Sequence, residues 1–157
     1  MKLHRSMTIL VLVLVTVDQV SKWLAQAHLP FQQPVPVIPF FSLFLTHNRG
    51  VAFSMLTWIG STGLIIMTVI IIGFLLWLWK RVPREQQLAN FGFAFVLSGA
   101  VGNLIDRVFQ GYVIDYFLVH TQSWAFAVFN VADSFITIGA VAIIAQEVLL
   151  SRQKKVQ

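Results

Sequence analysis

The chain has 157 residues, of which 57% are hydrophobic and 11% are charged, and its mean hydropathy is +0.79. Soluble domains carry about 25% charged residues, so this composition cannot cover a water-facing surface. It excludes a soluble enzyme and a disordered chain, and it predicts one domain that exposes its apolar excess to lipid. Because the sequence has no cysteine, disulfides, thiolate metal sites and a cysteine nucleophile are also excluded.

Four stretches are apolar and long enough to cross a bilayer core of about 30 Å as helices. They are residues 7–27, 61–79, 88–105 and 131–150. The predicted fold class is therefore an α-helical integral membrane protein with four transmembrane helices, in a single membrane-embedded domain, residues 1–157.

The first span also has features of a cleavable secretory signal peptide. Basic residues precede its apolar stretch, and residues 25–27 read Ala-Gln-Ala, like a cleavage site. Asp18 and Lys22 argue against this interpretation, because on a helix they face each other as an i,i+4 pair. We therefore predict an uncleaved helix with internal polar chemistry.

The distribution of basic residues predicts the orientation. Two basic residues, Arg49 and Arg107, fall in one set of connections, and eight fall on the other side of the membrane. By the positive-inside rule, both termini are then cytoplasmic and the two long connections lie outside. The eight are Lys2, Arg5, Lys80, Arg81, Arg84, Arg152, Lys154 and Lys155.

The two outer connections, residues 28–60 and 106–130, are too polar to span the membrane and too apolar to be free loops. Four prolines between residues 30 and 39 forbid a helix there and favour extended backbone. Apolar residues alternate along 41–45 and 124–128, which predicts a short strand in each connection. The sequence thus predicts a small extended or β platform on the extracytoplasmic side, against the outer leaflet.

The four aspartates are candidates for function, because ionisable residues are costly in or beside hydrocarbon. All of them fall in or beside the outer half, and Asp115 and Asp133 bracket one external segment. Two carboxylates in a poorly solvated site cannot easily both ionise, so one keeps a proton while the other acts as a base. Such a pair is the apparatus of an aspartic protease. The structural alternative is that Asp133 caps the fourth helix.

Polar residues form five compact clusters, which in this order resemble the lipoprotein signal peptidase (signal peptidase II) family over nearly the whole chain. The clusters are Asp18-Gln19 with Lys22, Asn48-Arg49-Gly50-Val51-Ala52-Phe53, Gly102-Asn103-Leu104-Ile105-Asp106-Arg107, Val113-Ile114-Asp115-Tyr116 and Phe129-Asn130-Val131-Ala132-Asp133-Ser134. The resemblance implies a membrane aspartyl endopeptidase that removes signal peptides from diacylglyceryl-modified bacterial prolipoproteins and cleaves before the lipidated cysteine.

The family pattern also implies the site. Asp115 and Asp133 match its catalytic pair. The positions that line or brace its active site correspond here to Asp18, Lys22, Asn48, Gly50, Asn103, Arg107 and Asn130. We expect no cofactor, no metal and no nucleic acid, prolipoproteins and membrane lipid as partners, and a monomer. The implied location is the bacterial cytoplasmic (inner) membrane, with the active site at the extracytoplasmic face. Two departures are Ser98, where Gly-Gly is common before Ala100, and Tyr116, where Phe is usual.

Structural roles remain open for several of these residues. Asp18 and Lys22 can form a buried pair without touching substrate. The amide of Asn103 can serve an interhelical hydrogen bond beside the small-residue step of Ser98 and Gly102. Arg107 can stabilise a helix C-terminus or orient a carboxylate or a substrate carbonyl, and Asp106 is most simply its structural partner.

Other functions find less support in the sequence. The four histidines lack H-E-x-x-H spacing, and no serine lies in a full G-x-S-x-G elbow. A transporter or proton relay would need acids through the inner half of the membrane, where Glu147 stands at the edge. A purely structural scaffold does not explain why Asn and Asp concentrate on one side.

Overall fold

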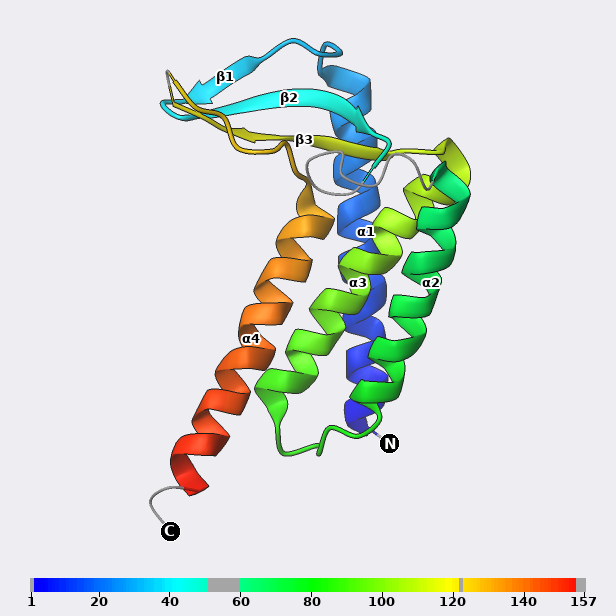
Figure 1. The fold of residues 1–157 in the computed structure, drawn as a ribbon, viewed down its shortest axis with the longest axis vertical. Helices are drawn as coiled ribbons and strands as arrows, with labels where there is room; N and C mark the ends of the chain where they lie inside the picture. Colours follow the sequence, from blue (N-terminus) through cyan, green and yellow to red (C-terminus); the bar gives the residue numbers. More distant parts are fainter. Residues whose placement is uncertain (1, 51–59, 122, 155–157) are drawn as a thin grey trace.

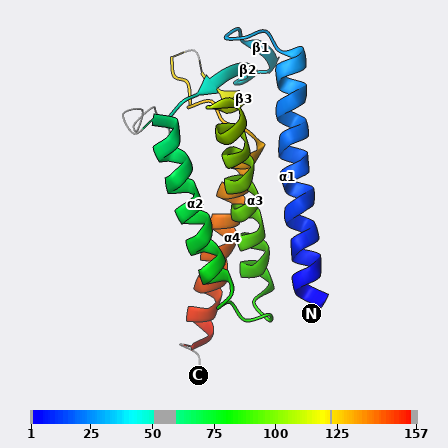
Figure 2. The same cartoon turned by 90° about the vertical axis from the view of Figure 1, so that its right-hand side faces the viewer.

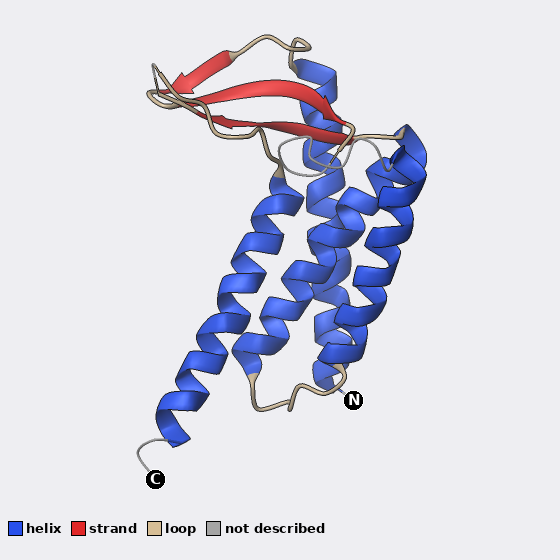
Figure 3. Cartoon of the chain, in the orientation of Figure 1, coloured by secondary structure: helices blue, strands red, loops and turns tan. Residues whose placement is uncertain are grey.

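Four helices and a small sheet make up the part of the chain that the computed structural model describes, residues 2–50, 60–121 and 123–154 (Figures 1 and 3). The helices are α1 (Lys2–His28), α2 (Gly60–Trp79), α3 (Gln87–Gln110) and α4 (Val131–Lys154). The strands are β1 (Val35–Ile38), β2 (Phe41–Asn48) and β3 (Val113–Val119). All four helices are long and apolar enough to cross a membrane. The predicted class, four transmembrane helices with a small sheet, is confirmed.

The sheet lies across one end of the helix bundle. The N-terminus, the turn between α2 and α3, and the C-terminal end of α4 lie at the opposite end (Figure 1). Helix α3 stands between α1 and α2 (Figure 2), contacts the other three helices, and is the most buried of the four. Polar side chains on α3 can therefore reach partners on every other helix.

Helices α3 and α4 approach closely because glycines face the contact. A Cβ added to Gly92 would lie 2.7 Å from the carbonyl oxygen of Gly139, and one added to Gly99 would lie 2.3 Å from that of Ala132. The predicted small-residue step at Ser98 and Gly102 is used differently. Gly102 makes room for the carboxylate of Asp18, which a Cβ would approach to 2.4 Å, because α1 packs on that face of α3.

The sheet is antiparallel, in the order β1-β2-β3. The proline-rich segment is extended, as expected, and forms β1. The predicted strand at 124–128 is wrong, because the strand in the second connection is β3. The segment that follows β3 contacts it only at two isolated bridges, Phe117 with Phe129 and His120 with Ala125. One edge of β3 pairs with β2 over most of its length, with an irregularity between Leu43 and Thr46, while the alanine-containing segment on its other edge leads to α4.

Helix α3 continues past the predicted end of its span at residue 105. It ends at Gln110, where Gly111 adopts the left-handed conformation, φ 79°, and its N–H donates to the Arg107 carbonyl. Glycine favours this conformation, which terminates helices. The extra turn places Asp106 and Arg107 on a rigid helix rather than in a loop.

Candidate active site

The N-terminus of α4 is closed by a reciprocal pair of hydrogen bonds. The backbone N–H of Asp133 donates to Asn130 Oδ1 at 3.0 Å, and the backbone N–H of Asn130 donates to Asp133 Oδ2 at 3.1 Å. This is a capping box, with Asn130 as the cap. The alternative that Asp133 caps α4 is therefore wrong. Asp133 stands at the third helical position, where the positive end of the helix dipole interacts favourably with a carboxylate.

The other free amides of this helix end also have partners. The N–H of Ala132 donates to Asp18 Oδ1 at 2.9 Å, and that of Val131 reaches the Tyr116 hydroxyl. Burial raises the pKa of Tyr116 to about 12, so its hydroxyl keeps its proton. Three elements, α1, β3 and the cap itself, thus hold the start of α4 in place.

A buried ion cluster lies behind this helix end. The Lys22 ammonium is 2.9 Å from Asp18 Oδ2 and 2.7 Å from Asp106 Oδ2, and it donates to Asn103 Oδ1 at 3.0 Å. Lys22 is 1% exposed and both aspartates are fully buried. The predicted Asp18–Lys22 pair is present. Asp106, however, pairs with Lys22 rather than with Arg107, because consecutive residues of a helix point in different directions.

Gln19, to which the sequence analysis assigned no role, adds a second link between α1 and α3. Its Nε2 lies 3.1 Å from Asp18 Oδ2, 3.1 Å from Asp106 Oδ1 and 3.2 Å from the Gly102 carbonyl. The Asp18-Gln19 cluster contained this residue. Only the fold of α1 against α3 shows that it binds the same two carboxylates as Lys22.

Asn103 connects the ion cluster to Asp133. Its Nδ2 donates to Asp133 Oδ1 at 2.9 Å, while its Oδ1 accepts from Lys22 and from Asn130 Nδ2, the latter at 3.3 Å. The interhelical hydrogen bond foreseen as a structural alternative exists, and its acceptor is one of the two candidate aspartates.

Asp115 lies on β3 and is held by two asparagines. Asn130 Nδ2 donates to its Oδ1 at 2.7 Å, and Asn48 Nδ2 donates to its Oδ2 at 2.9 Å. Burial, followed by the nearby charge of Asp133, raises the pKa of the Asp115 carboxyl from 3.8 to about 7. Asn130 therefore binds both candidate aspartates, and their surroundings differ: Asp115 is buried on a strand, whereas Asp133 stands in the first turn of α4.

An apolar cavity of about 820 Å³ opens beside this pair. Asp133 lines it directly, whereas Asp115 is 2% exposed and lies behind Asn48, which lines the cavity. Helix α2 supplies a wall that sequence patterns did not single out, because its residues are almost all apolar. The lining residues include Leu64, Met67, Thr68, Ile71 and Leu75 of α2, Val96 and Ala100 of α3, Ile136 and Ile138 of α4, and Phe126, Ala127, Val128 and Phe129.

Arg107 also lines the cavity. Its Nη2 donates to the carbonyl of the buried Gly50 at 3.0 Å, and among the described residues no acceptor lies within reach of its buried Nε. The guanidinium lies within electrostatic range of Asp115 and Asp133. Within the described ranges no three metal-ligating side chains come together. Val51, Ala52 and Phe53 of the Asn48 cluster lie outside the described residues.

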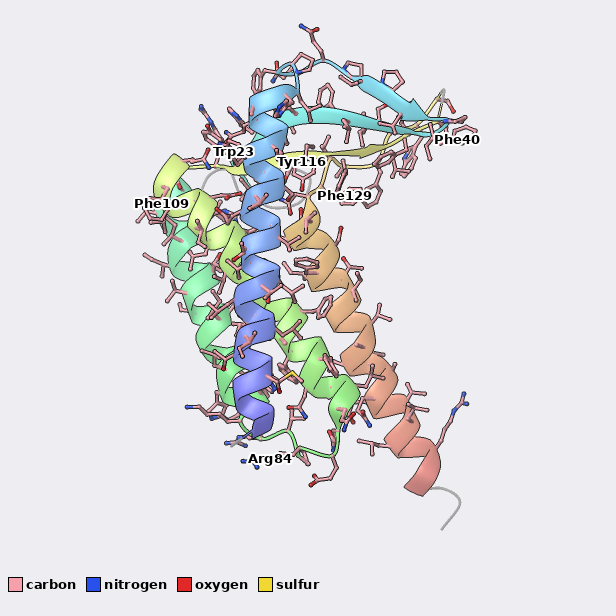
Figure 4. The ribbon with its side chains drawn as sticks, turned by 180° about the vertical axis from the view of Figure 1, so that it is seen from behind. Trp23, Phe40, Arg84, Phe109, Tyr116 and Phe129 are labelled. Atoms are coloured by element: carbon pink, nitrogen blue, oxygen red, sulfur yellow. The ribbon has the colours of Figure 1, made fainter. Side chains whose placement is uncertain are left out.

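Figure 4 shows Tyr116 beneath the sheet beside α1, and Phe129 directly above the start of α4. The nine predicted site residues fall into two connected groups. Asn48, Asn103, Arg107 and Asp133 line the cavity, and Gly50, Asp115 and Asn130 contact these residues from behind. Asp18 and Lys22 form the second group, which lies behind Asn103. The structure thus brings all nine together, and Asp18 contacts Lys22 and the N-terminus of α4 rather than the cavity.

This fold and these paired aspartates define a class, the membrane-embedded aspartic peptidases. The family described as Signal peptidase (SPase) II, Peptidase_A8, matches residues 10–149. The chain belongs to this signal peptidase II family.

Several individual proteins are similar to the chain. The lipoprotein signal peptidase of Sinorhizobium fredii is 49% identical over 145 residues, covering 92% of this chain and 87% of the relative. Those of Brucella ovis and Brucella abortus are 48% identical over 158 aligned positions, covering 99% of both chains. A bacterial membrane enzyme solved by the in meso method at 2.3 Å matches with a TM-score of 0.83 and 28% identity, over 97% of this chain and 92% of its own.

We expect Lys22→Met to destabilise the protein strongly. It leaves Asp18 and Asp106 buried without their cation, and breaking such a cluster costs about 3–5 kcal/mol of unfolding free energy. Thermal unfolding in detergent measures the loss. The matched control is Gln26→Met, one turn further along α1, where the exposed side chain contacts Gln110 and the change should stay within about 0.5 kcal/mol. Equal unfolding temperatures for the two variants would contradict a central role for Lys22.

Proposed function

We propose that the protein removes signal peptides from diacylglyceryl-modified bacterial prolipoproteins, cleaving before the lipidated cysteine with a water activated between Asp115 and Asp133. The observation that carries this proposal is the link that Asn130 makes between the two aspartates at the edge of an apolar cavity. The names of the relatives, lipoprotein signal peptidases, support the substrate.

The different surroundings of Asp115 and Asp133 suit them to different catalytic roles. Asp133, ionised at the start of α4, takes a proton from water, and the resulting hydroxide attacks the carbonyl carbon of the scissile peptide. Asp115, holding a proton, gives it to the carbonyl oxygen as the tetrahedral intermediate forms. Asp133 then protonates the leaving nitrogen and the C–N bond breaks. Asp115 takes back a proton from the intermediate's hydroxyl, so both carboxyls return to their starting states.

The substrate must reach Asp115, which does not line the cavity. Asn48 lines it and donates to Asp115 Oδ2. A substrate carbonyl that displaces this amide would expose the Asp115 proton and accept it. The Nε of Arg107, which has no partner among the described residues, can donate to a substrate carbonyl and so hold the peptide against the two aspartates.

The cavity suits a substrate that is already in the membrane. Its walls on α2, α3 and α4 are apolar, and a signal peptide together with the acyl chains of a diacylglyceryl cysteine is apolar over most of its surface. Each buried methylene of an acyl chain contributes about 0.8 kcal/mol. The chains would thereby raise occupancy and hold the scissile bond at the depth of the aspartates.

The proposed location is the bacterial cytoplasmic (inner) membrane, with both termini cytoplasmic and the site at the extracytoplasmic face. The α2–α3 turn, with its basic residues, and both chain ends lie opposite the sheet (Figure 1), which agrees with the positive-inside rule. We propose that the protein acts as a monomer on membrane substrates and has no nucleic-acid partner.

Asp115→Asn and Asp133→Asn should each abolish cleavage while the protein remains folded and inserted. An amide can neither accept nor release the required proton, and it keeps the size of the carboxyl. The double variant should lose little more than either single variant, because the pair acts as a unit. Cleavage of a lipidated prolipoprotein by the purified variants is the measurement. Activity of either single variant within about tenfold of wild type would rule out the pair.

Cleavage should decline as the pH rises through about 7. The pKa of Asp115 is raised to about 7, so its proton is present below that pH and lost above it, where both aspartates become ionised. Asn48→Ala removes a hydrogen bond that lowers this pKa, so its alkaline limb should move to higher pH. The measurement is kcat/KM against pH for both proteins. A shift of the limb to lower pH in Asn48→Ala would contradict the assignment of the proton to Asp115.

A prolipoprotein whose cysteine is unlipidated or replaced by serine should be cleaved at least about a hundredfold more slowly, a loss of ~2.7 kcal/mol in transition-state stabilisation. The two substrates are compared in the same detergent with the same enzyme. Equal cleavage of both would show a general membrane protease and refute the proposed substrate. No cleavage of either would refute the peptidase itself.

A further inference from the structure

One end of the sheet carries large apolar side chains that no described residue covers. These five residues are named here the apolar tip: Ile38, Phe40, Val119, Trp124 and Phe126, each between 39% and 63% exposed. They come from the end of β1 and the β1–β2 turn, from the end of β3, and from the segment that leads to α4.

Backbone contacts bring these three segments together. Phe41 pairs with Val119 across the sheet, and the N–H of His120 donates to the Phe40 carbonyl at 2.9 Å. The N–H of Phe126 donates to the Val119 carbonyl at 2.8 Å, and the rings of Trp124 and Phe126 have centroids 5.9 Å apart. The apolar tip is therefore one surface rather than scattered residues.

The tip projects sideways from the helix bundle. In Figure 1 the sheet extends past the start of α4, and Figure 4 shows Phe40 at the far point of this overhang. Below it runs α4, whose Val141 and Ile144 are 61% and 63% exposed, as expected of a helix that faces lipid. The tip thus overhangs the side of the bundle on which α4 lies (Figure 1).

The two connections that form the sheet have almost no charged residues, which a water-exposed sheet normally carries. Residues 28–48 contain no Lys, Arg, Asp or Glu, and residues 112–130 contain Asp115, which is buried. A contiguous exposed apolar surface without charged neighbours marks an interaction site. Tryptophan, present here as Trp124, is enriched where membrane meets water.

The backbone conformation of Phe40 also supports an interaction at the apolar tip. Its φ is 69°, in the left-handed region that bulky side chains avoid because the backbone is strained there. The backbone is held in this turn by the N–H of His120, and the side chain of Phe40 is left 62% exposed, away from the described protein. Gln32 also has a positive φ, 56°, and offers a matched polar position on the same platform.

We propose that the apolar tip inserts into the lipid leaflet beside α4 and anchors the sheet on the membrane surface. The occupant of the surface is bilayer lipid, the boundary between headgroups and acyl chains. Phe126 belongs both to the tip and to the wall of the cavity, and four residues later the chain reaches Asn130. Lipid contact at the tip therefore supports the wall of the site and the segment that precedes its capping asparagine.

The natural absence of cysteine allows a direct test with single labels. Phe40→Cys and Trp124→Cys place an environment-sensitive fluorophore on the tip, and Gln32→Cys places it at the matched control position. The full chain is reconstituted into phosphatidylcholine–phosphatidylglycerol vesicles, with or without brominated acyl chains. Circular dichroism confirms that the variants are folded.

Brominated lipid should reduce emission from residues 40 and 124 at least about twofold more than from residue 32, because an interfacial anchor lies within the bromine-bearing boundary. Aqueous iodide should show the reverse order. Tip labels quenched by iodide and unaffected by bromine would overturn the proposal. The proposal would also be overturned if emission from the tip labels changed with the protein-to-lipid ratio but not with bromination, because a second copy of the chain would then cover the tip. Neither readout depends on peptidase activity.

Discussion

The buried ammonium group of Lys22 is the contact on which the rest of the site depends. Its three donors bind Asp18 on its own helix and Asp106 and Asn103 on α3, so it joins α1 to α3 at the level of the site. A charge at this depth is stable because two carboxylates surround it. Their excess negative charge is offset in turn by the N-terminus of α4, where Asp18 accepts from Ala132. One cation thus fixes the relative positions of three helices.

Two asparagine side chains link that cluster to the two aspartates by hydrogen bonds. Asn103 binds Lys22 and Asp133, and Asn130 binds Asn103 and Asp115. An amide has both donor and acceptor, so each asparagine is oriented by one neighbour before it binds the next. The result is a pair of chemically identical side chains in different surroundings, one at a helix N-terminus and one buried on a strand. In the proposed mechanism this difference, rather than any difference of residue type, separates base from acid.

The sequence predicted the helices because membrane-length apolar runs have few alternative structures, and it predicted the site because polar residues are scarce in such a chain. It could not assign contacts between distant segments. Asn130 and Asp133 are both good caps, and only the start of α4 shows which one caps it. The sequence favoured Arg107 as the partner of Asp106 because the two are neighbours, whereas Lys22 is far away in the sequence. The wall formed by α2 carries no signal, because an apolar residue that faces a cavity resembles one that faces lipid.

In the proposed mechanism Asp115 holds the proton of the pair and Asp133 acts as the base. Infrared spectroscopy of the reconstituted protein at mildly acid pH measures this protonation directly, because a protonated carboxyl has a C=O stretch distinct from that of a carboxylate. A protonated-carboxyl band should disappear in Asp115→Asn and persist in Asp133→Asn. A band that disappears in Asp133→Asn and persists in Asp115→Asn would contradict the mechanism.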